Sequence, residues 1–166
     1  MISRYPVFRE RLSAEWAEAR QAAEKAIQAF AAYAPEHPQA SIYLDAVALN
    51  LHGFYNGLER IFEWVARQLD GTMPEGRSWH RDLLNQMSLT ISGVRPALIQ
   101  PTTQNQLEAY LGFRHLVRNL YTWQFDPEKI GQLIHSLPDT VARLDSDFQT
   151  FQQFLDAASR ADTLTE

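Results

Sequence analysis

The sequence predicts an all-α fold, an antiparallel bundle of about five helices. Apolar residues recur at three- and four-residue spacing over long stretches, and no stretch alternates with period two for long enough to form a strand. Four turn-rich breaks separate the helical segments, at residues 34–41, 71–78, 93–104 and 124–127. At a length of 166 residues a single domain is expected, covering residues 1–166.

The first two expected helices show the clearest periodicity. The first covers about residues 7–33, where the apolar residues are Phe8, Leu12, Trp16, Ala19, Ala23, Ile27 and Phe30. The second covers about residues 41–70, where the apolar residues are Val47, Leu51, Phe54, Leu58, Ile61, Val65 and Leu69. Such spacing places each set on one face of a helix.

The third and fourth helices are predicted mainly from their first residues. Ser78 is a candidate N-cap for a third helix that runs through WHRDLLNQMSLTI. Thr103 and Gln106 have the spacing of a capping box, which predicts that the fourth helix opens at Thr103.

The fifth helix has signals at its start and in its interior. Asp126 is a candidate N-cap, and Pro127 suits the first helical position because its missing N–H would have no partner there. Pro138 lies further along, and its ring cannot sit within an unbroken hydrogen-bond ladder. We therefore expect the last helix to be kinked or split at Pro138.

The composition excludes several classes of protein. The chain has no cysteine, which excludes disulfides, thiolate chemistry and cysteine-bound zinc. Its formal net charge of −5 argues against a general nucleic-acid coat, so any nucleic-acid site must be local. No apolar run approaches the roughly 18 residues of a membrane span, and the charged N-terminal stretch has no signal-peptide core. We therefore expect a cytoplasmic protein without a membrane partner.

The fourth helix carries the residues that most suggest chemistry, in the stretch GFRHLVRNLYTWQFDPEKI. Its expected core face consists of Phe113, Leu116, Val117 and Leu120. The polar patch beside that face consists of Arg114, His115, Arg118, Asn119 and Tyr121. Two arginines one turn apart repel each other, whereas an anion such as phosphate would satisfy both. The same pattern is also typical of a solvated helix face.

The stretch FRHLVRNLYTWQFDPEKI resembles the signature of the HepT-like ribonuclease toxins, a branch of the all-helical HEPN superfamily. HepT toxins typically read R-N-x-x-x-H-x-Y, and this chain reads Arg114-His115-x-x-x-Asn119-x-Tyr121. The histidine and asparagine have exchanged places, which moves the imidazole by one turn, roughly 6 Å, along the same patch. The segments YLDAVALNLHGFYNGLERIFEWVARQLDG, WHRDLLNQM and RPALI also resemble this subfamily, so the resemblance covers about residues 40–155.

This resemblance implies a homodimeric, metal-independent endoribonuclease that acts as the toxin of a toxin–antitoxin system. Arg114 and Arg118 would hold the scissile phosphate of the RNA and stabilise the charge of the transition state. His115 would transfer protons, with one histidine from each protomer supplying the base and the acid. Asn119 would orient the imidazole or donate a hydrogen bond to the phosphate.

The resemblance also implies a protein partner. The antitoxin of HepT systems is a small nucleotidyltransferase that attaches adenylyl groups to the matching tyrosine, a modification known as AMPylation. In this chain the matching residue is Tyr121. Phosphates added beside Arg114 would occupy the anion site and block RNA by charge and bulk.

Two more residues are possible supporting groups. Glu59 could pair with Arg114 or Arg118 across the bundle, although a solvated carboxylate among charged neighbours is the simpler interpretation. His80 could reach the cleft from the start of the third helix, although an exposed histidine in the first turn is simpler.

Other site types have no support in the sequence. His37, His52 and His135 lie in no motif, and neither H-E-x-x-H, a glycine-rich phosphate loop nor a nucleophile elbow is present. We therefore expect no metal and no cofactor. Two alternatives to the nuclease stay open. One is a non-catalytic HEPN-type dimer that binds the nucleotidyltransferase or a nucleotide, and the other is a helical bundle of unrelated function.

Overall fold

The computed structural model describes residues 4–119 and 125–165. Its elements are α1 (Arg4–Ala32), α2 (Ala40–Val65), the π-helical segment η1 (Ala66–Asp70), α3 (Trp79–Met87), α4 (Pro101–Asn119) and α5 (Pro127–Thr165). Within these ranges the β structure amounts to a single bridge between Ile91 and Arg95. The predicted all-α bundle is confirmed. No helix in the described ranges has both the length and the apolar character to cross a membrane.

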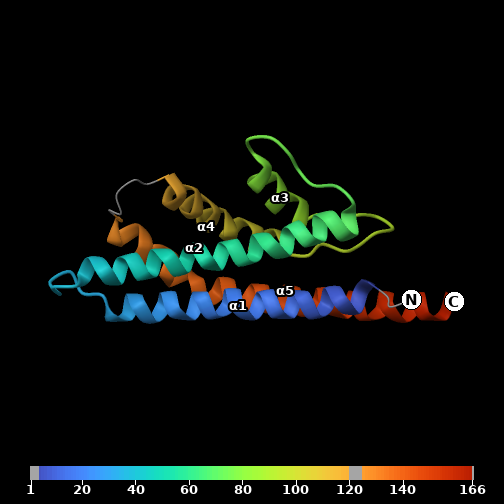
Figure 1. The fold of residues 1–166 in the computed structure, drawn as a ribbon, viewed down its shortest axis with the longest axis horizontal. Helices are drawn as coiled ribbons and strands as arrows, with labels where there is room; N and C mark the ends of the chain where they lie inside the picture. The colour runs from blue at the N-terminus through green and yellow to red at the C-terminus, as the bar shows by residue number, and fades with distance from the viewer. Residues whose placement is uncertain (1–3, 120–124, 166) are drawn as a thin grey trace.

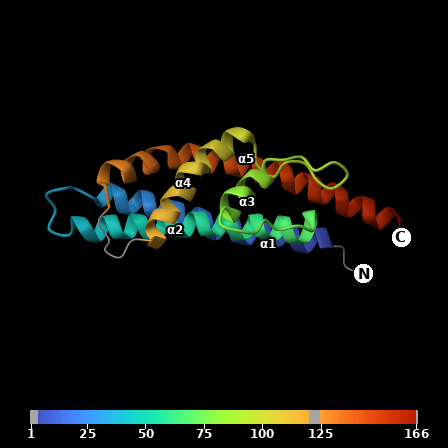
Figure 2. The same cartoon turned by 90° about the horizontal axis from the view of Figure 1, so that it is seen from above.

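The helices are arranged around α2. α1 and α2 form a long antiparallel hairpin, and α5 packs along α1 (Figure 1). α3 and α4 lie on the side of α2 that faces away from α1. Seen from above, α4 crosses α2 at an angle (Figure 2). α2 therefore packs against α1 on one side and presents its opposite side to α3 and α4.

Small residues allow α1 and α2 to approach closely. Ala19, Ala23 and Ala26 on α1 are buried, and Gly57 of α2 lies against the first of them. A Cβ atom built at Gly57 would lie only 2.8 Å from the Cβ of Ala19. The glycine is therefore required by the packing of the two helices, not by the backbone conformation of α2.

The third helix is shorter than the sequence predicts. α3 begins after Ser78 as expected, but it ends at Met87 and does not continue to residue 91. The buried guanidinium of Arg95 donates to the carbonyl oxygens of Gln86 and Leu89, at 3.2 and 3.0 Å. These bonds satisfy carbonyl groups at the C-terminus of α3 and hold the returning chain against it.

The capping box predicted for the fourth helix does not form. α4 begins at Pro101, and the hydroxyl of Thr103 donates instead to Asp147 of α5, at 2.7 Å. The side chain of Gln106 also turns to α5, where it donates to Asp139 and accepts from Thr140. Both residues therefore join α4 to α5, because partners from another helix replace the local ones.

The last helix begins where the sequence predicts and runs through its proline. The amide N–H of Glu128 donates to the side chain of Asp126, at 3.0 Å, and α5 begins at Pro127. α5 is not split, since it continues across Pro138 as one helix. Its axis curves along its length (Figure 2). Of the two predicted outcomes the split does not occur, and a proline within a long helix is accommodated by bending.

Candidate active site

The side chain of Arg114 points from α4 into the interface with α2. Only 11% of it is exposed. Its Nε donates to Oδ1 of Asn56 at 2.8 Å, and its Nη2 lies 3.0 Å from Oε1 of Glu59. Both partners belong to α2 and lie one turn apart. The guanidinium is therefore fixed by two neighbouring side chains and is not part of a solvated face.

Glu59 is the centre of this network. Its side chain is 6% exposed, and its two oxygens bond to different partners, Arg114 and His80. The pairing with Arg114 across the bundle is thus present, and the simpler interpretation of a solvated carboxylate is wrong. The neighbouring Arg60 points to the other side of α2, where it pairs with Glu15 of α1 at 2.9 Å. Sequence neighbours on a helix face different directions, which is why charge near Glu59 in the sequence says little about its environment.

His80 completes the network from α3. Its Nδ1 lies 2.6 Å from Oε2 of Glu59, and its Nε2 lies 3.5 Å from Nη1 of Arg114. The side chain is 16% exposed, so the prediction of an exposed first-turn histidine is wrong. The ring of Trp79 lies against that of His80, with 3.5 Å between the centroids. Hydrogen bonds and ring contact together fix the position of the imidazole.

A cavity of about 270 Å³ lies beside this network, between α3 and α4. The residues that line it are Arg77, Ser78, His80, Arg81, Leu111, Gly112, Arg114 and His115. Arginine and histidine make up most of this lining, and none of these residues is acidic. The cavity is therefore suited to an anion with several acceptor oxygens, such as a phosphate group.

Arg77 and Arg81 belong to this cavity but were not singled out in the sequence. They flank His80 in the stretch RSWHR, where the concentration of basic residues was the available signal. Arg81 also pairs with Glu108 of α4, at 3.5 Å, with most of the arginine exposed. Arg77 and Arg81 thus extend the positive charge of the cavity toward solvent.

The predicted patch on α4 is divided by the structure. His115 is exposed and lines the basic cavity with Arg114, whereas Arg118 is exposed one turn further along. Asn119 is the last residue of α4. The side chain of Asn119 and the whole of Tyr121 lie outside the residues that the structure describes.

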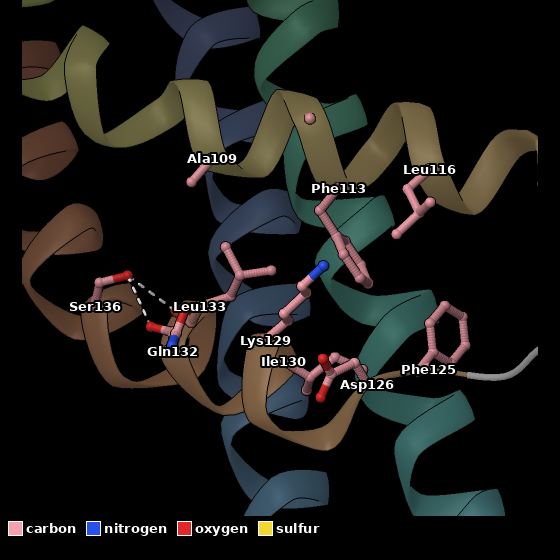
Figure 3. Close-up of a pocket in the computed structure, with 11 residues that line it drawn as sticks. Ala109, Phe113, Leu116, Phe125, Asp126, Lys129, Ile130, Gln132, Leu133 and Ser136 are labelled. Carbon is pink, nitrogen blue, oxygen red and sulfur yellow. Dashed lines mark hydrogen bonds between the residues drawn. The ribbon is translucent and has the colours of Figure 1, made fainter.

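One residue of the expected core face of α4 is not in the core. Phe113 and Val117 are buried as predicted, but 48% of Leu116 is exposed. Leu116 lines a second, largely apolar cavity of about 540 Å³ between α4 and α5 (Figure 3). Phe113 and Phe125 lie in the same cavity (Figure 3). Because this space separates the two helices, no side chain of α5 covers Leu116 fully.

Two further polar side chains of α2 lie near Arg114. Nδ1 of His52 and the hydroxyl of Tyr55 are buried atoms without a hydrogen-bond partner in the described part of the chain. Burial lowers the pKa of His52 below its ordinary value, and the positive charges of Arg114 and Arg118 lower it further against the opposing effect of Glu59. Burial, together with the charge of Glu59, raises the pKa of Tyr55. Both groups are therefore neutral at pH 7.

Among residues 4–119 and 125–165, no three His, Asp or Glu side chains are grouped so that they could hold a metal ion. The chemistry that this site offers from its own residues is anion binding by guanidinium groups and proton transfer by imidazole.

The chain is similar to a known protein family. A protein family described as HepT-like protein matches residues 46–155. The matched range includes Asn56, Glu59, His80 and Arg114, and thus every member of the buried network. No curated protein and no solved structure matches the chain.

Proposed function

Because the chain belongs to the family of HepT-like proteins, we propose that it is the toxin of a toxin–antitoxin pair and acts as a metal-independent endoribonuclease. The observation that carries this proposal is the basic cavity between α3 and α4, with Arg114 anchored at its wall. A local cavity of this kind reconciles RNA binding with a net charge of −5, since only a few phosphates need to be held.

Phosphate binding is the first task of the proposed site. Arg114 is held by Glu59 and Asn56, so its orientation is set before any substrate arrives. A guanidinium that is already oriented stabilises charge on a reacting phosphate without reorganising in the transition state. Arg77 and Arg81 line the same cavity and would bind the same phosphate or the next one.

Proton transfer is the second task. His115 is exposed at the cavity and would exchange protons with the substrate. Arg118 and Asn119 follow one turn later on α4 and would contact the RNA chain beyond the cavity. The reaction is attack of the ribose 2′-hydroxyl on phosphorus, which leaves a 2′,3′-cyclic phosphate and a 5′-hydroxyl group.

The proposed toxin is a homodimer in which α4 of one subunit faces α4 of the other. The exposed Leu116 of α4 supports this arrangement, because a large apolar side chain gains from being covered. Such a dimer would bring two copies of His115 and Arg118 to one RNA-binding groove.

Regulation by a nucleotidyltransferase antitoxin is part of the same proposal. The antitoxin would adenylylate Tyr121, which follows α4 by two residues. Added phosphates would compete with RNA for the basic residues of α4. Mass spectrometry after incubation with the antitoxin and ATP tests this step, and modification at another residue, or none, would sink it.

A cleavage assay tests the nuclease itself. Purified protein with RNA and a chelator should give fragments that end in 2′,3′-cyclic phosphate, and His115→Gln should lower the rate about 100-fold or more. His135→Gln is the matched control, since His135 is exposed on α5 outside the site. Equal rates in both variants would refute the assignment of His115. Binding of the antitoxin without any RNA cleavage would favour the non-catalytic dimer.

A further inference from the structure

His80 has the arrangement of an oriented proton carrier. Its Nδ1 lies 2.6 Å from the Glu59 carboxylate. Because an ionised carboxylate can only accept, the proton of this hydrogen bond belongs to Nδ1 of the imidazole. In the neutral ring Nε2 is then the nitrogen whose electron pair can accept a proton. Nε2 lies on the Arg114 side of the ring, 3.5 Å from Nη1, where the basic cavity is.

Building on the proposed ribonuclease activity, we infer that His80 transfers a proton in RNA cleavage and that Glu59 is its positioning residue. His80 and His115 line the same cavity of a single subunit. One subunit therefore contains both a base and an acid, and the proton chemistry does not depend on a histidine from the second subunit.

The two histidines differ in a way that suggests their roles. His80 is 16% exposed and has a carboxylate behind it, which stabilises the imidazolium formed when the ring accepts a proton. His115 is exposed and therefore exchanges protons with solvent more readily. The charged and titratable groups around His80 come from three elements. They are Glu59 from α2, Arg114 and His115 from α4, and Arg77 and Arg81, which lie before and after His80 in the chain.

The inferred step can be written atom by atom. Nε2 of His80 takes the proton of the 2′-hydroxyl group, and the 2′-oxygen forms a bond to phosphorus. The bond between phosphorus and the 5′-oxygen breaks, and His115 donates a proton to that oxygen. The two histidines then return to their starting states through proton exchange with solvent. Arg114 holds the non-bridging oxygens while the negative charge on them increases.

A purely structural role for His80 makes different predictions. The bond to Glu59 also connects α3 to α2, so substitution of His80 affects the fold as well as any chemistry. A structural link has no dependence on the leaving group of the substrate. An acid–base role does, because a sulfur leaving group departs without being protonated.

The experiment compares ordinary RNA with RNA in which sulfur replaces the 5′-bridging oxygen at the cleavage site. We expect His80→Gln to lower kcat about 100-fold to 10,000-fold on both substrates, with a much smaller change in KM. His115→Gln should be slow on ordinary RNA and regain most of its rate on the sulfur substrate. Glu59→Gln should lower kcat by a smaller factor than His80→Gln does, and it should change the dependence of kcat on pH. His135→Gln should match the wild type throughout.

A second variant separates a folding defect from the loss of the imidazole group. His80→Ala should regain part of its activity when free imidazole is added, which a structural defect would not. The inference is overturned if His80→Gln keeps the wild-type kcat and pH profile while His115→Gln is impaired. If His80→Gln recovers on the sulfur substrate and His115→Gln does not, the assignment of His80 as the base is overturned, since His80 would then be the acid. A wild type that cleaves neither substrate refutes the proposed ribonuclease itself, and the inference with it.

Discussion

Arg114 and Glu59 form an ion pair between α4 and α2, with 3.0 Å between Nη2 and Oε1 and side-chain exposures of 11% and 6%. His80 and Asn56 add hydrogen bonds to the same two side chains. Three helices therefore meet at one small polar cluster. This cluster has consequences for stability as well as for the proposed chemistry.

Removing Arg114 should destabilise the protein. Arg114→Ala leaves Glu59 buried without its cation, and loss of one partner of a buried pair costs about 3–5 kcal/mol. Arg118→Ala, at an exposed position one turn later, should cost less than about 0.5 kcal/mol. Urea denaturation of both variants measures the difference. Equal stability of the two would show that the Arg114–Glu59 pair contributes nothing.

Arg95 and Asp70 should be as sensitive, although they lie outside the proposed site. Their side chains are 0% and 1% exposed, and Arg95 also donates to three backbone carbonyls. We expect Arg95→Ala to cost at least about 3–5 kcal/mol, because it strips partners from a buried carboxylate and from those carbonyls. Arg143→Ala breaks an exposed pair with Asp139 and should leave the free energy of unfolding almost unchanged. A small effect of Arg95→Ala in urea denaturation would contradict this account of the α3–α4 connection.

Two glycines within helices should respond in opposite directions to alanine. Gly57→Ala places a Cβ 2.8 Å from that of Ala19 and should cost about 1–3 kcal/mol through overpacking. Gly112→Ala meets nothing within 4 Å and should stabilise α4 by up to about 1 kcal/mol. Thermal unfolding of both variants checks the pair. If the two shift the melting temperature alike, the close approach of α1 and α2 is not what requires glycine at position 57.

The buried imidazole of His52 should make stability depend on pH. Burial, followed by the charge of Arg114, lowers its pKa in the folded state below the ordinary value of 6.5. The unfolded chain therefore takes up this proton at a higher pH than the folded chain does, so the free energy of unfolding falls as the pH drops below 6.5.

His52→Gln should reduce that fall. The comparison is urea denaturation of wild type and variant from about pH 7.5 to about pH 5, where one group contributes at most about 1.4 kcal/mol per pH unit. His135→Gln, at an exposed position on α5, is the control and should leave the slope unchanged. An unchanged slope in His52→Gln would contradict the assigned environment of His52.

The sequence predicted the helices better than their ends. The stripe from Val47 to Val65 predicted α2 because every member is buried on one face of a long helix. The start of α4 was mispredicted because Thr103 bonds to Asp147 on α5, a partner that local spacing cannot reveal. Pro138 was expected to kink or split the last helix, which is not split and curves along its length.

The site was predicted in part. The polar patch on α4 identified Arg114 and His115, and both line the basic cavity. The burial of Glu59 and His80 could not be predicted, because it depends on how α3 and α4 cross α2. Leu116 was assigned to the core from its angular position on the helix, and only the distance between α4 and α5 reveals that it is exposed.

The most direct test of the central claim is a crystal structure with a dinucleotide that lacks the attacking 2′-hydroxyl group and so is not cleaved. The claim is that the cavity between α3 and α4 binds the scissile phosphate. We predict a phosphate oxygen within about 3 Å of the Arg114 guanidinium, with the ribose facing Nε2 of His80. A dinucleotide bound at saturation on another surface, with Arg114 and His80 contacting only each other, Asn56 and Glu59, would contradict the claim.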